Sequence, residues 1–204
     1  MGSPEPTSSV RRRKRKFYEM GFNWRSKGSC EFVNWNVLIG PYAIHAPRSR
    51  GFSKFPEKPL LVVDKKKGLP PDMMQLDAYW LISDRMKLLL ETVDPDGFDF
   101  LDCDVRLPDG KPGPGYWFCD VVRVVEAIDE TRSRMNIGHH QKTGIKFYHL
   151  GNADLKFRED FPRDVHVFRD VLLDSYVFCD QELKDACKLA SLRGLKFRDA
   201  SKPL

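Results

Sequence analysis

The hydrophobic pattern of one segment recurs without gaps 97 residues further along the chain. Tyr79–Phe100 aligns with Tyr176–Phe197. In both segments an apolar run of strand type ends at a residue that favours helix N-caps, Ser83 or Asp180. An amphipathic stretch, a glycine and a short apolar run follow. The pattern therefore predicts two similar strand–helix–strand units.

The two amphipathic stretches predict helices over Asp84–Val93 and Gln181–Leu192. Gly97 and Gly194 follow these helices, where a helix C-terminus favours a residue with positive φ. Apolar residues at helical spacing should face the core, and they are Met86, Leu89, Leu90, Leu183, Ala186 and Cys187.

Further strands are predicted in the first third of the chain. The apolar positions of Lys16–Met20, Phe32–Ile39 and Leu60–Asp64 are typical of strands. Residues 40–59 are rich in proline, glycine and arginine, so we expect an extended surface loop there, with Phe52 and Phe55 contacting the core.

The second half contains a more ambiguous stretch. Apolar residues at 118, 121, 122, 125 and 128 fit a helical stripe, although the valines suit a strand equally well. A short helix with Asp120 as its cap is favoured. The polar residues 134–146 predict a loop, and the segments on either side of Gly151-Asn152 predict a hairpin.

Strands outnumber helices in this reading, and the predicted fold class is α+β. We expect a single domain over residues 14–204, with two similar strand–helix–strand units and long surface loops. Residues 1–13 lack periodicity and predict a disordered basic arm.

The net charge of +5 arises within residues 1–16, which hold six basic side chains and one acid, so the remaining domain is neutral overall.

The composition of the chain limits the classes of protein to which it can belong. The longest apolar runs are too short to cross a membrane. The five cysteines are scattered without a C-x-x-C motif, which favours reduced thiols in a cytoplasmic protein. Burial is the expected role of Cys179 and Cys187, which fall in the second unit.

Motifs for catalysis or cofactor binding are missing from the sequence. It has no P-loop, no G-x-G-x-x-G and no G-x-S-x-G, so we expect no cofactor and no catalytic residue. The adjacent His139 and His140 do not share a helix face, and His45, His149 and His166 are scattered, so no metal site is expected either.

Acidic residues are concentrated in one stretch. Residues 91–109 carry seven acids and one base, Arg106. Three interpretations stay open: a solvated turn, a docking surface for a basic partner, and a weak cation site.

Four strings of the second half occur in a specific order: YWFCDVVRVVEAIDETRS, LKFRED, HVFRD and CDQELKDACKLASLRGLKFRD. With PEKPLLVVDKKKGLPPDMMQLDAYWLISDRMKLLLETVDPDGFDFLDCDV in the first half, this order resembles immunity protein family eleven of bacterial polymorphic-toxin systems, in its Gram-negative branch. The resemblance covers about residues 14–204.

The resemblance implies a non-enzymatic cytoplasmic protein that binds and neutralises a toxin delivered between bacteria, often by a type VI secretion or Rhs-type system. It carries over no catalytic residues. The acidic stretch suggests where the toxin would bind, with two aromatic residues as nearby anchors. The predicted partner-binding residues are Asp94, Asp96, Asp99, Asp102, Asp104, Tyr116 and Trp117.

Two other classes of function stay open. One is an enzyme whose site is assembled from dispersed residues, for example Asp120, Arg123, Glu126 and Asp129. The other is a nucleic-acid-binding protein that uses the basic arm, and the neutrality of the domain makes this unfavourable. The sequence predicts neither a membrane partner nor an oligomeric state.

Overall fold

The computed structural model describes residues 15–38, 50–53, 55–76 and 79–203. The predicted basic arm, residues 1–13, lies outside the described residues. Strands predominate over helices, in agreement with an α+β to mainly β fold. No helix of the described ranges is long and apolar enough to cross a membrane.

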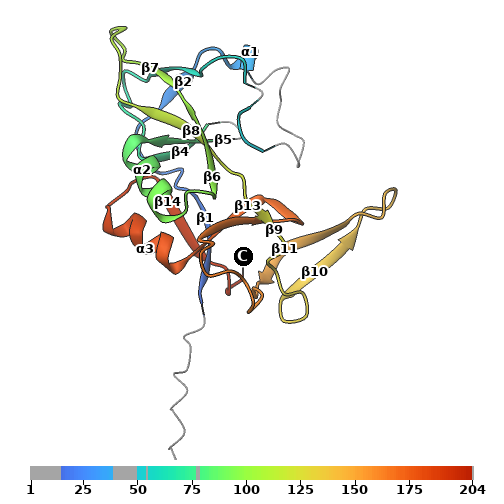
Figure 1. Ribbon diagram of the computed structural model, residues 1–204. Coiled ribbons are helices and arrows are strands. Elements are labelled where there is room, and N and C mark those ends of the chain that lie inside the picture. The colour runs from blue at the N-terminus through green and yellow to red at the C-terminus, as the bar shows by residue number, and fades with distance from the viewer. Residues whose placement is uncertain (1–14, 39–49, 54, 77–78, 204) are drawn as a thin grey trace, which may run out of the picture.

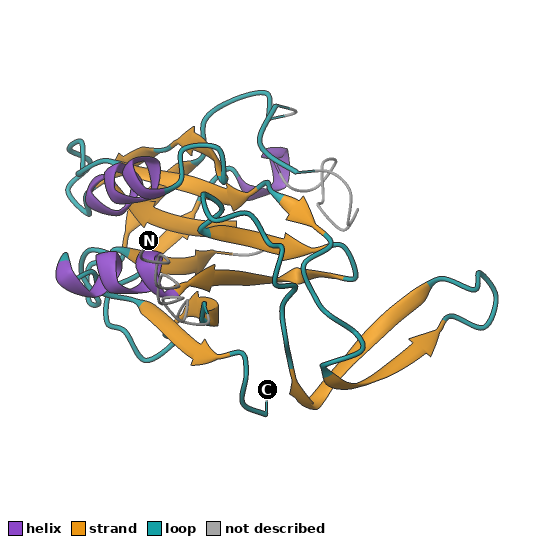
Figure 2. Ribbon diagram, turned by 60° about the horizontal axis from the view of Figure 1, so that its bottom comes forward, coloured by secondary structure: helices purple, strands orange, loops and turns teal. Residues whose placement is uncertain are grey.

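Four sheets and three helices make up the described part of the chain (Figures 1 and 2). The four-stranded sheet has the order β4-β5-β8-β6, with β4 at Met73–Leu76, β5 at Tyr79–Ser83, β8 at Tyr116–Val121 and β6 at Phe98–Asp102. The five-stranded sheet has the order β14-β1-β13-β12-β9, with β14 at Leu195–Asp199, β1 at Phe17–Phe22, β13 at Leu173–Asp180, β12 at Val167–Asp170 and β9 at Val124–Val125.

The remaining elements are smaller. A three-stranded sheet has the order β2-β3-β7, with β2 at Cys30–Phe32, β3 at Leu60–Val63 and β7 at Asp104–Arg106. A two-stranded sheet consists of β10 at Arg134–His139 and β11 at Lys146–Asp154. The helices are α1 at Trp35–Leu38, α2 at Asp84–Val93 and α3 at Gln181–Leu189.

Strand, helix and strand occur in the predicted order in both copies of the repeat. Helix α2 has its predicted bounds, whereas α3 ends three residues earlier than expected, at Leu189. Figures 1 and 2 show the two helices side by side.

The two large sheets share an order and a register. The strands before and after each helix flank a central antiparallel strand, which is β8 in one sheet and β1 in the other. Residues that align in the repeat also have equivalent partners across the sheet. The matched pairs are Ile82–Trp117 with Cys179–Tyr18, Phe98–Val121 with Leu195–Phe22, and Met73–Ile82 with Val167–Cys179. The similarity therefore extends to strands outside the aligned segments.

A central core lies between the two units. Alternate residues of a strand point to opposite faces, so Trp80 and Ile82 of β5 enter this core while Tyr79 and Leu81 enter a second one. Strand β13 divides in the same way, because Cys179 enters the central core and Phe178 a third. Both faces of each large sheet are thus covered.

The repeated glycines face the opposite unit. A Cβ on Gly97 would overlap a methyl group of Val167, and a Cβ on Gly194 would overlap the carbonyl group of Met73. Val167 and Met73 begin the equivalent strands β12 and β4. Gly194 has the predicted positive φ of +94°, but the prediction is wrong for Gly97, where close packing is the reason for glycine.

Other predictions from the pattern are also wrong. The stretch expected to be a short helix after residue 115 forms β8, which pairs on both sides and is buried on both faces. Burial on both faces removes the period-two signal of a strand. The predicted strand Phe32–Ile39 is instead the end of β2 followed by α1, whose Leu38 is buried, and Ile39 lies outside the described residues.

The predicted hairpin has its turn in another place. β10 occupies most of the expected loop 134–146, and the turn to β11 spans residues 140–145. Gly151-Asn152 lies inside β11 next to an irregularity of register, and Asn152 has a φ of 63°. Glycine and asparagine here mark a bulge, which needs the same backbone freedom as a turn. Of the predicted loop 40–59, residues 40–49 and 54 lie outside the described ranges, and Phe52 contacts the core as expected.

Candidate functional site

The N-caps of the two long helices have equivalent polar partners. Ser83 caps α2 and donates its hydroxyl to Asp72 Oδ1 at 2.8 Å. Asp180 caps α3, and its Oδ2 lies 2.9 Å from His166 Nδ1. Asp72 and His166 each stand one residue before the strand that pairs with the end of β5 or β13. The cap and its partner are therefore a shared feature of the two units.

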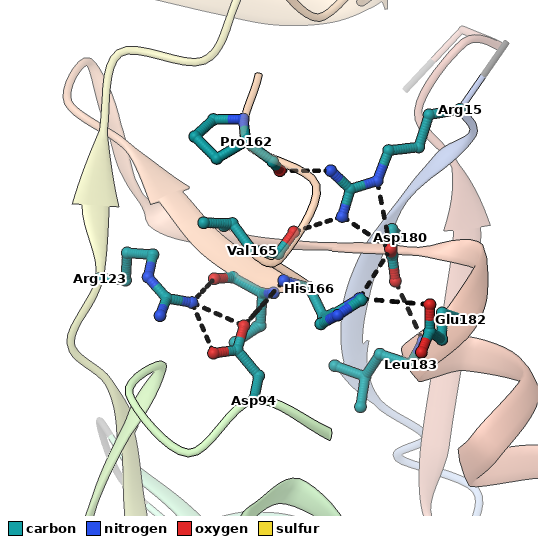
Figure 3. A network of polar contacts seen from close by, with 10 residues as sticks. Arg15, Asp94, Arg123, Pro162, Val165, His166, Asp180, Glu182 and Leu183 are labelled. Carbon is teal, nitrogen blue, oxygen red and sulfur yellow. Dashed lines mark hydrogen bonds and ion pairs between the residues drawn. The ribbon is translucent and has the colours of Figure 1, made fainter. Parts of the chain in front are cut away.

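The Asp180 cap is the centre of a larger network (Figure 3). The guanidinium of Arg15 donates Nη2 to Asp180 Oδ2 at 2.8 Å and Nη1 to the carbonyl oxygen of Pro162 at 2.6 Å. Asp180 is 3% exposed. Its second oxygen accepts the N–H of Leu183 at 3.0 Å. The carboxylate thus fixes the N-terminal segment, the β12 segment and helix α3 to one another.

The network includes the one group of three residues in the described ranges whose donor atoms lie close enough for a metal ion, His166, Asp180 and Glu182. Glu182 lies 3.8 Å from His166, and its side chain is 71% exposed. A cation would compete with Arg15, whose positive charge already lies on the same oxygen of Asp180. The arrangement therefore fits a structural ion pair better than a metal site.

Asp94 forms a second group of polar contacts next to the Asp180 network, and these contacts join the two units. The carboxylate is 2% exposed, and Arg123 Nη1 donates to its two oxygens at 2.7 and 2.6 Å. It also accepts the backbone N–H groups of His166 and Val167, at 2.8 and 3.0 Å (Figure 3). The loop after α2 is thereby fixed to the start of β12.

The opposite loop makes a reciprocal contact. The N–H of Arg193, after α3, donates to Asp72 Oδ2 at 2.8 Å, and Met73 donates its N–H to the carbonyl oxygen of Arg193 at 3.0 Å. Each unit thus fixes the first strand of the other through buried hydrogen bonds, which makes the centre of the molecule a rigid element.

The predicted partner-binding residues do not form one surface. Asp94 and Tyr116 are buried, and the Tyr116 hydroxyl donates to the carbonyl oxygen of Pro70 at 2.5 Å. These two side chains are therefore unsuited to contact a partner. Asp99 accepts the N–H of Phe52 at 2.8 Å and so serves the fold.

The other members of that set are more accessible. Asp96 is exposed. Asp102 and Asp104 have side chains 41% and 43% exposed and form ion pairs with Lys58 and Arg106. Trp117 is half-buried and donates its indole N–H to Asp84 at 2.7 Å. Only this accessible subset can carry the predicted interface.

The residues of the alternative enzyme site lie in separate environments. Asp120 is buried and accepts from Arg169 at 3.2 Å, whereas Arg123 pairs with Asp94. Glu126 is exposed. Asp129 closes a turn by accepting from Thr131 and Arg132, and these bonds lower its pKa to about 2. The predicted helix that would have aligned these groups does not form.

A comparison with protein families decides the class. The model of the immunity protein family (Imm11) matches residues 16–202. The chain belongs to the immunity protein family Imm11. The order of motifs in the sequence predicted this family, and that prediction is confirmed. A search of curated proteins finds no match.

The cysteines of this Imm11 protein are buried free thiols. Burial raises the pKa of Cys30 and of Cys187 to about 12 and that of Cys119 and Cys179 well above the ordinary value. A thiol with such a pKa is a poor nucleophile at neutral pH. The expected packing role of Cys179 and Cys187 agrees with their places in the central core.

Lys87 and Lys184 occupy the same position in the alignment of Tyr79–Phe100 with Tyr176–Phe197, and they have one environment in both units of this Imm11 protein. Lys87 Nζ lies 4.6 Å from the ring centroid of Trp117, and Lys184 Nζ lies 3.4 Å from that of Tyr18. Trp117 and Tyr18 occupy equivalent positions on the central strands. The repeated lysines are thus cation–π contacts of the fold, and the sequence alignment did signal them.

Sequence reasoning missed Asp72, His166 and Arg15, although these residues organise the centre of the molecule. Asp72 precedes its cap by 11 residues, whereas His166 precedes its cap by 14. An ungapped alignment cannot match positions that a loop of different length separates. Arg15 was counted with the basic tail, and only the folded chain shows its buried partner.

Proposed function

We propose that this protein neutralises a toxin by binding it and occluding its active site, inside the cytoplasm of the cell that produces both. The observation that carries the proposal is the family match over residues 16–202. The toxin would be an effector delivered between bacteria by a type VI secretion or Rhs-type system.

Two structural observations support binding over catalysis. The candidate enzyme residues have separate internal partners, and the His166–Asp180 pair is engaged by Arg15 and by the N-terminus of α3. A rigid centre held by buried polar contacts is also suited to present a preformed surface, which lowers the entropic cost of association.

The test is protection by stoichiometric binding. A toxin domain taken from a gene that adjoins the gene for this chain is expressed with and without the immunity protein, and growth is measured. We expect growth to recover, and purified proteins to form a complex with nanomolar or lower Kd, which corresponds to about −12 kcal/mol. An unrelated toxin domain is the control. Lack of protection by folded protein would contradict the proposal.

Titration separates occlusion from enzymatic inactivation. If the protein occludes, toxin activity falls in proportion to the immunity protein added and the mass of the toxin stays unchanged. Substoichiometric protection or a change in toxin mass would favour the enzyme alternative.

Deletion of the basic arm distinguishes toxin binding from the nucleic-acid alternative. A variant without residues 1–13 should protect as the full chain does, because the arm lies outside the family match. Loss of protection in that variant, together with nucleic-acid binding by the full chain, would favour the nucleic-acid alternative.

A further inference from the structure

The β10–β11 hairpin projects from the body of the molecule, as both ribbon views show (Figures 1 and 2). It is a two-stranded sheet, and no third strand pairs with it within the described ranges. Isolated two-stranded hairpins are of marginal stability in water. Tyr148 and Ala153 of β11 belong to the third core and fix the hairpin to the body.

The hairpin exposes apolar side chains towards its free end. Ile137, Ile145 and Phe147 are 41%, 59% and 37% exposed, respectively. The ring of Phe147 lies edge-on to that of His149, with centroids 4.8 Å apart. None of these three side chains belongs to the three cores.

The charge of the hairpin is mostly positive. Residues 134–154 contain Arg134, Lys142, Lys146 and three histidines, and one acid, Asp154, which ends β11 and pairs with Lys156 outside the hairpin. At the acid content of the whole chain, 29 in 204, about three acids would be expected in 21 residues. Lys146 pairs with Glu130 of the body, whereas Lys142 at the turn has no ion pair among the described residues. A partner surface that complements the hairpin is therefore acidic.

We infer that the β10–β11 hairpin is the element that docks onto the toxin, at an acidic surface with an apolar centre that receives Ile145. This inference rests on the proposed function and names the contact through which it acts. The cations steer the encounter, and the apolar tip supplies the contact that excludes water. A projecting hairpin can enter a concave site that the body of the molecule cannot.

Two substitutions at the turn test this inference without entering a core. Ile145→Asp places a negative charge at the apolar tip, and Lys142→Glu reverses the free cation. Leu189→Asp and Lys188→Glu on α3 are the matched controls, since Leu189 is 90% exposed and Lys188 adjoins it. The probe is the toxin domain used in the protection test, and the readout is Kd and association rate across a salt series.

We expect Ile145→Asp to weaken binding at least 10-fold, and Lys142→Glu to slow association several-fold and reduce its dependence on salt. The α3 controls should bind as the wild type does. Circular dichroism and thermal melts establish that all four variants are folded.

Three outcomes overturn the inference. If the wild type binds the toxin and Ile145→Asp binds equally well, the hairpin is not the contact, although the proposed function stands. If Trp24→Ala abolishes binding and the hairpin variants do not, the contact is the basic loop around Trp24, which is 72% exposed. If the protein alone is a dimer that Ile145→Asp dissociates, with toxin binding unchanged, the hairpin joins two copies. Failure of the wild type to bind ends both proposals.

Discussion

The imidazole of His166 lies 2.9 Å from the carboxylate of Asp180, the residue that caps helix α3. The equivalent contact in the other unit is neutral on one side, because there a serine, Ser83, caps the helix and Asp72 accepts its hydroxyl. The two caps thus have the same arrangement but different side chains, a hydroxyl in one unit and a carboxylate in the other. We therefore expect them to contribute differently to stability.

Removing the Asp180 carboxylate should destabilise the protein more than removing the Ser83 hydroxyl. Asp180→Ala leaves Arg15 and His166 without their buried partner, so we expect a loss of about 3 kcal/mol in the free energy of unfolding. Ser83→Ala removes a single cap and should cost about 1 kcal/mol. Urea unfolding measures both. Glu182→Ala, at an exposed position, is the control, and equal effects of the two cap variants would contradict this account.

The two glycines that face the opposite unit should resist substitution. Gly97→Ala forces a methyl group against Val167 and should cost about 1–3 kcal/mol. Gly194→Ala should cost more, since a positive φ adds about 1–2 kcal/mol to the overlap with Met73.

Gly21→Ala is the matched control for these glycines, because nothing lies within 4 Å of a Cβ at that position of β1. Thermal or urea unfolding should show a change within about 0.5 kcal/mol for this variant. A loss for Gly21→Ala as large as that for Gly194→Ala would show that strand propensity, and not contact between the units, determines the effect.

Stability should fall at alkaline pH because of the buried thiols. Burial raises the pKa of Cys30 and Cys187 from 9.0 to about 12, whereas an unfolded thiol ionises near 9.0. Between pH 9 and 12 the unfolded chain therefore binds fewer protons than the folded chain, so the free energy of unfolding decreases as pH rises. Below pH 9 these groups contribute no pH dependence.

Urea unfolding at pH 8 and pH 10.5 measures this effect, and Cys187→Ala should reduce the difference between the two. Ellman's reagent provides an independent check. It should react slowly with the folded protein at pH 8 and label five thiols after denaturation. Rapid labelling of folded protein would mean that at least one thiol is accessible.

The accessible acidic residues remain a second predicted contact with the toxin. Asp96, Asp102 and Asp104 are exposed or half-exposed, and β7 lies well apart from the β10–β11 hairpin in Figure 1. Changing all three to lysine should slow association with the toxin and make it less sensitive to salt, while the protein stays folded. Stopped-flow kinetics across a salt series measures this. Unchanged kinetics would remove the acidic stretch from the interface.

A residue of the candidate site could be predicted only where it belongs to a pattern of neighbouring residues in the sequence. The repeat exposed the caps Ser83 and Asp180 and the repeated lysines, since each belongs to a pattern within a few turns of chain. The acidic stretch misled, because Asp94 stands among exposed acids in the sequence and is buried against Arg123 in the fold. Charge density along a chain does not distinguish a solvated carboxylate from one that fixes a loop.

The sequence by itself determined the family, through the order of its motifs. It also determined the strand–helix–strand order of both units and the bounds of α2, because local hydrophobic periodicity and capping specify these two features. Only the tertiary structure decided that Tyr116–Val121 is a strand, since burial on both faces of a central strand erases its alternating pattern. The tertiary structure also decided which strand completes each large sheet. Strand β8 follows the first unit in the chain, whereas β1 precedes the second unit by more than 150 residues. Such long-range pairings depend on which surfaces meet in space, and no local pattern of residues encodes them.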